Sequence, residues 1–515
     1  MTHRHALISA LIFVCLWFVS PALAGRSIYV GPDDEFSSIV AGVEAAQPGD
    51  SVIVRAGEWS GGNFLTDIQG TAEARIHLLA ESGAGDVIIR GGTEALHISN
   101  PAWLHISGFV FEGQSGNGVN IDDGGDYGTP ARQVEIENCI FRNIDADGNN
   151  DLLKLSGLNN FSVRRCTFMN GAAGGSGIDM VGCHEGVIEG NIFSNLGASG
   201  IQAKGGTQFI TISRNRFDAA GARAVNLGGS TGLAFFRPID APFEAADLYV
   251  YANIFTGSEA PIAFVGSVRV EVVNNTIIRP GKWVFRVLQE NVDPQRFVLN
   301  GENTFSNNLV VVDAGLSTPA NIGPDTRPET YTVDHNLWYN LDFPDVFHVQ
   351  DIILDGRSVW AMDPRLEVAA GSENKLRVGS PAIGKGRAVE SPQYDHEGRR
   401  YGLPRSIGAF EFDDAVATTV HPADGSGAYG AQRTLTPHPN PAGDVLLFEL
   451  PPDCLSADLS VWILSLDGRT FKREPIPDAA TAGTMQISLA DLPAGVYLLF
   501  VSGNGIQMAG QFSHN

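Results

Sequence analysis

The sequence predicts an all-β protein in which a right-handed, single-stranded parallel β-helix is followed by a small C-terminal β-sandwich. Two observations predict the β-helix. A motif of the form Asn-x-apolar recurs at intervals of roughly 25 residues, and short alternating runs of apolar and polar residues lie between its copies. A third observation predicts the sandwich: after Leu435 the repeat gives way to short alternating runs with a turn signal about every ten residues.

The repeated motif predicts how the coils stack. Its asparagines are Asn191, Asn215, Asn253, Asn275, Asn308 and Asn336, with Cys139 and Cys166 at the same position in earlier copies, and its apolar residues include Phe141, Phe168, Phe193, Phe217 and Phe255. Coils stacked about 4.8 Å apart place equal positions in columns. We therefore expect an aromatic column in the core, an amide ladder at one turn, and neighbouring thiols rather than a disulfide at the two cysteines. A leucine-rich repeat is the competing solenoid, but its L-x-x-L-x-L pattern is missing.

The N-terminal segment is expected to direct export. Residues 1–24 combine a basic start, an apolar run from Ala6 to Val19 and an Ala-Leu-Ala site before Gly25, which is typical of a signal peptide. The run is too short to be a membrane anchor. An amphipathic stretch from Phe36 to Ala46 follows, and we expect it to form a helix that caps the first coil and covers its open edge.

Composition restricts the possible partners. The 515-residue chain carries a formal net charge of −24, with 60 glycines and 43% hydrophobic residues, so it is acidic, rich in turns and ordered over most of its length. Its 34 lysines and arginines are too few for general nucleic-acid binding. Any positively charged site must therefore be local, and a monomer is expected.

The order of cap helix, Pro-Gly-Asp turn and strand in "FSSIVAGVEAAQPGDSVIVRAGEW" resembles the beginning of parallel β-helix proteins of the pectate-lyase-like superfamily. The resemblance covers about Arg26 to Phe412 and implies the fold. It places the β-helix at residues 25–345. Residues 346–412, with "SPAIGKG" and "IGAFEF", resemble the closing segment of bacterial β-helix proteins and are expected to cover the last coil.

After a linker expected at residues 413–433, residues 434–515 resemble the C-terminal sorting domain of the type IX secretion system. The resemblance rests on Pro-Asn-Pro-Ala, then Asp-Gly-Arg, then Leu-Pro-Ala-Gly-Val-Tyr. It implies the type IX machinery as a partner and a secreted or cell-surface protein that passes through the periplasm. The chain departs from the pattern at its end, where Ser513, His514 and Asn515 replace the usual basic residues. An ordinary carbohydrate-binding or adhesive sandwich is the alternative.

One strand of each coil predicts a polar stripe on an outward sheet face. Alternation places its apolar residues inward and leaves a column of outward residues, namely Asn120, Lys154, Asp179, Gln202, Asn226, Ala263 and Arg286. A second outward column contains Lys204. A flat sheet of stacked coils suits an extended polymer, so Lys154, Asp179, Gln202, Asn226 and Arg286 are predicted to bind substrate. A cross-strand ion pair between Lys154 and Asp179 is an equally good interpretation.

The longest insertion of the repeat follows this stripe. The segment "GGSTGLAFFRPIDAPFEAAD" carries Phe235, Phe236 and Arg237 and leaves the sheet at the same end as Lys204. Long loops beside a sheet often carry function. We expect the two aromatic residues to form a wall beside the substrate.

These groups favour β-elimination over hydrolysis. A glycosidase needs two placed carboxylates, and the stripe offers only Asp179, with Asp122 two coils away. A lyase needs a base for the C5 proton of a uronic acid and a cation beside the carboxylate. Lys204 is the predicted base, since nearby cations can lower a lysine pKa. Arg237 or Arg223 is the predicted neutraliser, and His184 lies close in sequence, although a structural role is the simpler interpretation for it.

This arrangement resembles the lysine and arginine of the alginate lyase and chondroitinase-B type β-helix lyases. The resemblance is partial, because the family's arginine one coil later is replaced by Asn226 or Gly228 and its acidic calcium ligands are missing. Calcium is therefore left open as a cofactor, and no metal ligands are assigned. The predicted substrate is an acidic polysaccharide. A β-helix glycoside hydrolase and a non-catalytic surface protein that binds glycans remain the alternatives.

Overall fold

The computed structural model describes residues 25–344 apart from 84, 127 and 317, then residues 357–367 and 374–412. In the C-terminal part it describes residues 433–435, 437–450, 460–465, 470–475, 484–503 and 506–514. The chain divides into two compact units, Met1–Thr419 and Val420–Asn515. The predicted signal peptide and all but the last residue of the predicted linker lie outside the described residues.

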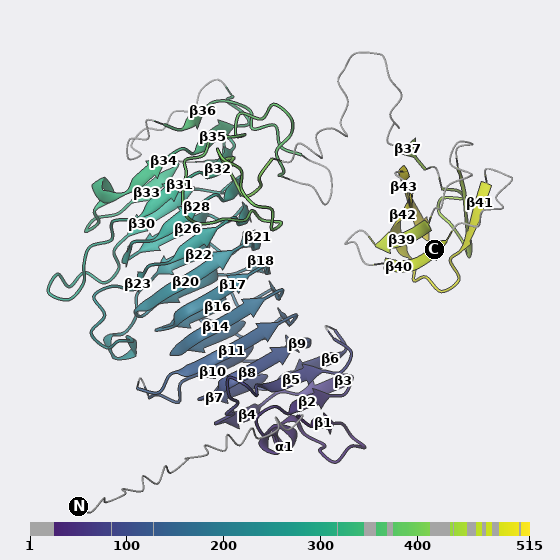
Figure 1. Ribbon diagram of the computed structural model, residues 1–515, viewed down its shortest axis with the longest axis horizontal. Helices are drawn as coiled ribbons and strands as arrows, with labels where there is room; N and C mark the ends of the chain where they lie inside the picture. Colours follow the sequence, from purple (N-terminus) through teal and green to yellow (C-terminus); the bar gives the residue numbers. More distant parts are fainter. Residues whose placement is uncertain are drawn as a thin grey trace, which may run out of the picture. The chain divides into compact units, whose positions relative to one another are not determined.

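Three parallel sheets form the walls of a β-helix, as Figure 1 shows. The first has fourteen strands and runs from β1 (Ser27–Val30) to β34 (Thr332–Asp334); the second has twelve and runs from β3 (Gly57–Ser60) to β36 (Val359–Trp360). The third has ten strands, namely β4 (Asn63–Thr66), β7 (Leu96–Ser99), β10 (Val119–Asp122), β13 (Leu153–Ser156), β16 (Ser176–Val181), β19 (Ser199–Lys204), β22 (Arg223–Gly228), β26 (Ala260–Val265), β30 (Phe285–Leu288) and β33 (Ala320–Ile322). The predicted all-β fold class is confirmed.

The aromatic column and the amide ladder are both present. The rings of Phe141, Phe168, Phe193, Phe217 and Phe255 stack with centroids 4.7–4.9 Å apart. In the ladder each backbone N–H donates to the side-chain oxygen of the asparagine one coil on, as from Asn215 to Asn253 at 2.9 Å. The N–H of Cys166 donates to Asn191 in the same way, and the buried Cys139, Cys166 and Cys183 are free thiols. The prediction of stacked thiols without a disulfide is therefore confirmed.

A helix lies at the N-terminal end of the β-helix. Helix α1 (Ile39–Glu44) lies beside β1, β2 (Ser51–Val54) and β4 (Figure 1), and Ser38 caps it by accepting a hydrogen bond from the Ala41 N–H at 3.2 Å. The described part of the closing segment packs along the side of earlier coils, where Asn274 donates to the backbone oxygens of Ser406 and Gly408.

The C-terminal unit is a small sandwich with its own core. One sheet has the order β37 (Arg433–Thr434), β43 (Ile506–His514), β42 (Gly495–Gly503), β39 (Ser460–Ser465) and β40 (Thr470–Pro475), and the other pairs β38 (Val445–Glu449) with β41 (Thr484–Ser488). Its core includes Leu446, Ile463, Leu499 and Phe512. The described part of the chain contains no helix with the length and apolar character needed to cross a membrane.

Candidate active site on the ten-stranded sheet

Strand pairing reproduces the predicted outward column on the ten-stranded sheet. Lys154 pairs with Asp179, Asp179 with Gln202, and Gln202 with Asn226. The column continues through Ala263, Arg286 and Asn321. We call this column, together with Lys204 of the neighbouring column, the polar stripe.

The centre of the polar stripe is a cluster of two lysines and two buried aspartates. Lys154 forms an ion pair with Asp179, as one of the two interpretations of the sequence proposed. Lys204 reaches diagonally across the strand pair, and its Nζ lies 3.3 Å from Oδ1 of Asp179, whereas Nζ of Lys154 also lies 3.5 Å from Oδ2 of Asp151. The Asp179 side chain is 1% exposed and that of Lys204 is 13% exposed. Of Asp179 and Lys204, Lys204 is therefore the one whose side chain solvent reaches.

The charges in this cluster respond to burial and to one another. Burial, together with the charge of Asp179, raises the pKa of Asp151 to about 6. Burial alone would lower the pKa of Lys154, but the Asp179 and Asp151 carboxylates outweigh it, so this pKa is raised and Lys154 stays charged. At neutral pH the Asp151 carboxylate is ionised, and below about pH 6 it takes up a proton, so the cluster loses one negative charge.

One arginine lies beside the polar stripe and a second lies further along it. Arg223 donates to Oδ1 of Asn226 at 3.2 Å and forms an ion pair with Glu290 at 3.2 Å. Arg286 donates to Oδ1 of Asn321 at 3.0 Å, and its guanidinium lies 4.6 Å from the ring centre of Trp283. Arg223 and Arg286 are half-buried and Asn226 is buried, so the two guanidinium groups rather than this amide face solvent.

His184 and Arg237 meet each other but do not converge on Lys204. The Arg237 guanidinium is buried and donates to the backbone oxygen of Gly182 at 2.8 Å, and it lies 3.5 Å from Nδ1 of His184. Nε2 of His184 faces the backbone oxygens of Gly206 and Arg237 at 3.1 and 3.2 Å. Burial and the Arg237 charge lower the pKa of His184. The two side chains thus hold the long loop against the sheet. The sequence alone could not show that the Arg237 side chain turns inward.

The two phenylalanines of the loop have different environments. Phe235 is 66% exposed, whereas Phe236 is fully buried in a small core with Ala241, Phe243 and Phe297. Only Phe235 remains available to contact a substrate. Phe235 is the last residue of the short helix η1 (Leu233–Phe235), and Phe236 follows it in an extended conformation.

Glu244 holds this loop against the strand end that carries Lys204. Its buried carboxylate accepts hydrogen bonds from the Thr231 N–H at 2.8 Å, from the Thr231 hydroxyl at 2.7 Å and from the Gly205 N–H at 2.9 Å, and it also contacts Asn291. The role of Glu244 could not be predicted from the sequence, because an insertion has no repeat register that would predict the direction of its side chains. Asp151 was also missed, although it lies three residues before Lys154, one coil before Asp179.

Gly229 leaves the space that the Lys204 side chain occupies. A Cβ atom at this position would lie 2.8 Å from Nε2 of Gln202 and 3.4 Å from Cδ of Lys204. The glycine therefore keeps bulk away from the outward face at the point where the long loop begins.

Comparisons with known proteins agree with this architecture. The family described as "Right handed beta helix region" matches residues 94–277, and the family described as "Secretion system C-terminal sorting domain" matches residues 437–512. The chain is a right-handed parallel β-helix protein with a C-terminal sorting domain. No curated protein sequence matches it significantly.

Several solved structures align with this β-helix protein at low sequence identity. Pectate lyase Pel9A aligns with a TM-score of 0.51 at 13% identity, over 76% of this chain and 97% of its own. The Azotobacter vinelandii mannuronan C-5 epimerase AlgE4 A-module aligns with a TM-score of 0.43 at 16% identity, over 65% and 99%. An alginate lyase from Paenibacillus sp. str. FPU-7 aligns with a TM-score of 0.35 at 16% identity, over 60% and 99%. At this identity the pectate lyase likeness establishes the fold alone.

No group of three or more His, Cys, Asp or Glu side chains within the described ranges is placed to hold a metal ion. Asp122 accepts hydrogen bonds from the Ser99 hydroxyl and from the Gly124 N–H within its turn. It also pairs with His97 at 2.7 Å, which extends the charged surface two coils beyond Lys154.

Proposed function

We propose that this protein is an exported polysaccharide lyase that cleaves an acidic polysaccharide by β-elimination at the polar stripe. The observation that carries the proposal is the sharing of one buried carboxylate, Asp179, by Lys154 and Lys204. Lys154 makes the closer contact and is the more strongly held. We assign the proton transfer to Lys204, whose Nζ makes the longer contact with this carboxylate, at 3.3 Å.

In this mechanism Nζ of Lys204, in its neutral form, accepts the proton at C5 of a uronic acid unit. The electron pair of the C–H bond forms the C4–C5 double bond, the bond from C4 to the glycosidic oxygen breaks, and the leaving oxygen takes up a proton. Gln202, which is half-buried on the polar stripe, donates to sugar hydroxyls, whereas Asn226 is buried and positions Arg223 by accepting its hydrogen bond. The step needs no co-reactant beyond the amine and water.

A cation beside the uronate carboxylate lowers the barrier because negative charge develops there. Arg223 and Arg286 lie on the polar stripe and fit this role better than Arg237, whose guanidinium is bonded to Gly182. We therefore assign Arg237 and His184 to positioning the loop. Phe235, exposed on that loop, forms the wall beside the substrate.

Export follows from the two ends of the chain. The C-terminal sorting domain points to secretion or cell-surface display through the type IX system. We propose that the signal peptide expected at residues 1–24 first takes the chain to the periplasm. Acidic polysaccharides outside the cell are then the accessible substrates.

The test is to incubate the mature protein with alginate, pectate, chondroitin and ulvan and to follow the ultraviolet absorbance of unsaturated uronate. We expect absorbance with one of these polymers. Lys204→Ala should lower kcat by about a thousandfold, the size of a lost general base, while Arg237→Lys should chiefly affect stability. New reducing ends without absorbance would indicate a hydrolase, and saturable binding without any product would indicate a non-catalytic glycan-binding protein. Either result would refute the lyase.

A further inference from the structure

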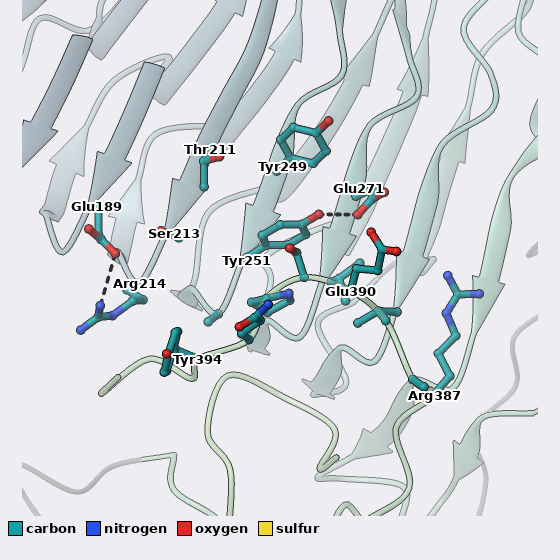
Figure 2. A pocket seen from close by; sticks show the side chains of 17 residues that line it. Glu189, Thr211, Ser213, Arg214, Tyr249, Tyr251, Glu271, Arg387, Glu390 and Tyr394 are labelled. Carbon is teal, nitrogen blue, oxygen red and sulfur yellow. Dashed lines mark hydrogen bonds and ion pairs between the residues drawn. The ribbon is translucent and has the colours of Figure 1, made fainter. Parts of the chain in front are cut away.

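A pocket of about 740 Å³ lies on a different face of the β-helix, between the fourteen-stranded sheet and the closing segment. Its floor comes from β17 (His184–Glu189), β20 (Thr207–Ser213), β24 (Tyr249–Tyr251) and β28 (Glu271–Val273). Its other wall is the segment 387–394 (Figure 2). The volume falls within the roughly 300–1,000 Å³ of ordinary ligand sites.

Two tyrosines on the floor give the pocket an aromatic surface. In the strand register Thr211, Tyr249 and Glu271 form one outward column, and Ser213, Tyr251 and Val273 form the next. The tyrosine rings lie 5.8 Å apart at an angle of 35°. Tyr249 is half-buried and Tyr251 is buried, so Tyr249 is the ring that a ligand in the pocket can reach.

The carboxylates in the pocket outweigh its cations. Arg214 forms an ion pair with Glu189 at 3.3 Å, and Arg387 forms one with Asp334 at 3.3 Å. Among the described residues no basic side chain pairs with Glu271 or Glu390, and Glu271 accepts a hydrogen bond from the Tyr251 hydroxyl. Figure 2 shows Glu390 on the pocket side of its segment, with its carboxylate turned toward β24 and β28.

The wall formed by the closing segment is fixed in place. The backbone N–H of Arg387 donates to Oδ1 of the buried Asn307 at 2.9 Å. Arg405, itself 5% exposed, donates to the backbone oxygens of Val389 and Pro392 at 3.3 and 3.0 Å. The pocket is therefore formed before any ligand arrives, which lowers the cost of binding.

We infer that this pocket is a second carbohydrate site and that it binds a short, neutral saccharide. Tyrosine rings pack against the apolar face of a sugar ring, and carboxylates accept hydrogen bonds from its hydroxyl groups. Burial, reinforced by the carboxylates of Asp247 and Glu271, raises the pKa of Tyr249, so the Tyr249 hydroxyl stays neutral and can donate. The unpaired charges of Glu271 and Glu390 repel uronic acids, so the ligand differs from the acidic substrate proposed for the polar stripe. The site stands independently of that proposal.

Isothermal titration of the mature protein with neutral trisaccharides of glucose, xylose, mannose and galactose tests the inference. Tri-galacturonate and a glucosamine trimer serve as the anionic and cationic probes. We expect at least one neutral trisaccharide to bind and the anionic trimer not to bind at this site. Tyr249→Ala and Glu390→Gln should each weaken binding by about tenfold. Glu390 is exposed, so its isosteric variant keeps the fold.

The matched control is Phe235→Ala, which removes an exposed aromatic ring outside the pocket and should leave neutral-sugar binding unchanged. Lys204→Ala should also leave it unchanged, so failure of the lyase proposal and failure of this one are distinguishable. No binding of any neutral trisaccharide would overturn the inference. So would equal binding by wild type, Tyr249→Ala and Glu390→Gln, or tighter binding of the glucosamine trimer.

Discussion

At the scale of single residues, the polar stripe depends on how one buried carboxylate is shared. Asp179 lies between two lysines, and Asp151 adds a second carboxylate behind Lys154. Because both aspartates are buried, solvent screens their charges only weakly, and they interact strongly with the two lysine amino groups. The cluster is therefore expected to respond to pH through Asp151.

Asp151 is predicted to make the protein less stable as pH rises from about 4 to about 6. Its pKa is about 6 in the folded protein against an ordinary value of 3.8, so in this window the folded state binds more protons than the unfolded one. This contribution is present at low pH and is lost as pH rises through the folded pKa. In the Asp151→Asn variant the free energy of unfolding should lack this fall, which is on the order of 1–3 kcal/mol in the wild type. Urea unfolding at several pH values measures this free energy.

The Asn side chain is a suitable replacement, since its oxygen can still accept the hydrogen bond that the Ser176 N–H donates to Asp151 at 2.8 Å. If the difference in unfolding free energy between the variant and the wild type did not change between pH 4 and pH 7, the assigned pKa would be wrong.

At the scale of elements, the repeating coils could be predicted from the sequence much further than the long insertion. The coils repeat, so the sequence predicted the column from Asn120 to Arg286, the Asn215 ladder and the Phe217 column, each from period and stacking alone. The insertion after β22 has no register, so the buried positions of Phe236 and Arg237 and the central role of Glu244 could not be predicted. Diagonal contacts such as Lys204 to Asp179 also depend on side-chain reach, which a pattern of alternation does not specify.

Glu244 is predicted to fix the long loop beside Lys204. Glu244→Ala leaves the Thr231 and Gly205 N–H groups without their acceptor, at a cost of roughly 1–3 kcal/mol for each buried group. Hydrogen exchange should accelerate in residues 229–244 while the strands of the ten-stranded sheet keep their protection. Activity should fall about tenfold, since Gly205 follows the proposed base directly.

Asp240→Asn is the matched control, because Asp240 lies exposed in the same loop. Its exchange and activity should equal those of the wild type. Equal exchange in the Glu244→Ala protein would show that the carboxylate does not hold the loop.

The aromatic column is predicted to be a main source of stability in the middle coils. Phe217 is fully buried between Phe193 and Phe255, so Phe217→Ala opens a cavity and should cost roughly 3–5 kcal/mol. Phe217→Leu fills most of the volume and should cost clearly less. Denaturant unfolding of both variants measures the difference, and a similar loss for both would mean that ring stacking rather than volume stabilises the column.

At the scale of the whole molecule, the relevant properties are the organisation into two units and the net charge. The C-terminal sorting domain has a core separate from that of the β-helix, as the change of pattern after Leu435 predicted. The net charge of −24 sets a long-range repulsion against any acidic polymer, which only local cations on the polar stripe offset. The net charge of the protein therefore opposes the approach of an acidic polymer, and the cations of the polar stripe attract the polymer only at short range.

Salt is therefore predicted to raise kcat/KM for the acidic substrate. Between about 10 and 150 mM salt the screening length falls from about 30 to 8 Å, which weakens the repulsion by the whole molecule more than the short contacts of the polar stripe. We expect a rise of several-fold in initial rates at low substrate concentration. A steady fall with salt would mean that attraction by the stripe controls the encounter instead.

The central claim is that Lys204 removes the proton from the substrate. Its most direct test is the ultraviolet absorbance of unsaturated uronate formed by the wild type and by Lys204→Ala on the polymer that the substrate panel identifies, with both proteins shown to be folded by circular dichroism. The account predicts product from the wild type and about a thousandfold less from Lys204→Ala at unchanged KM. Equal rates of product formation by the two proteins would contradict it.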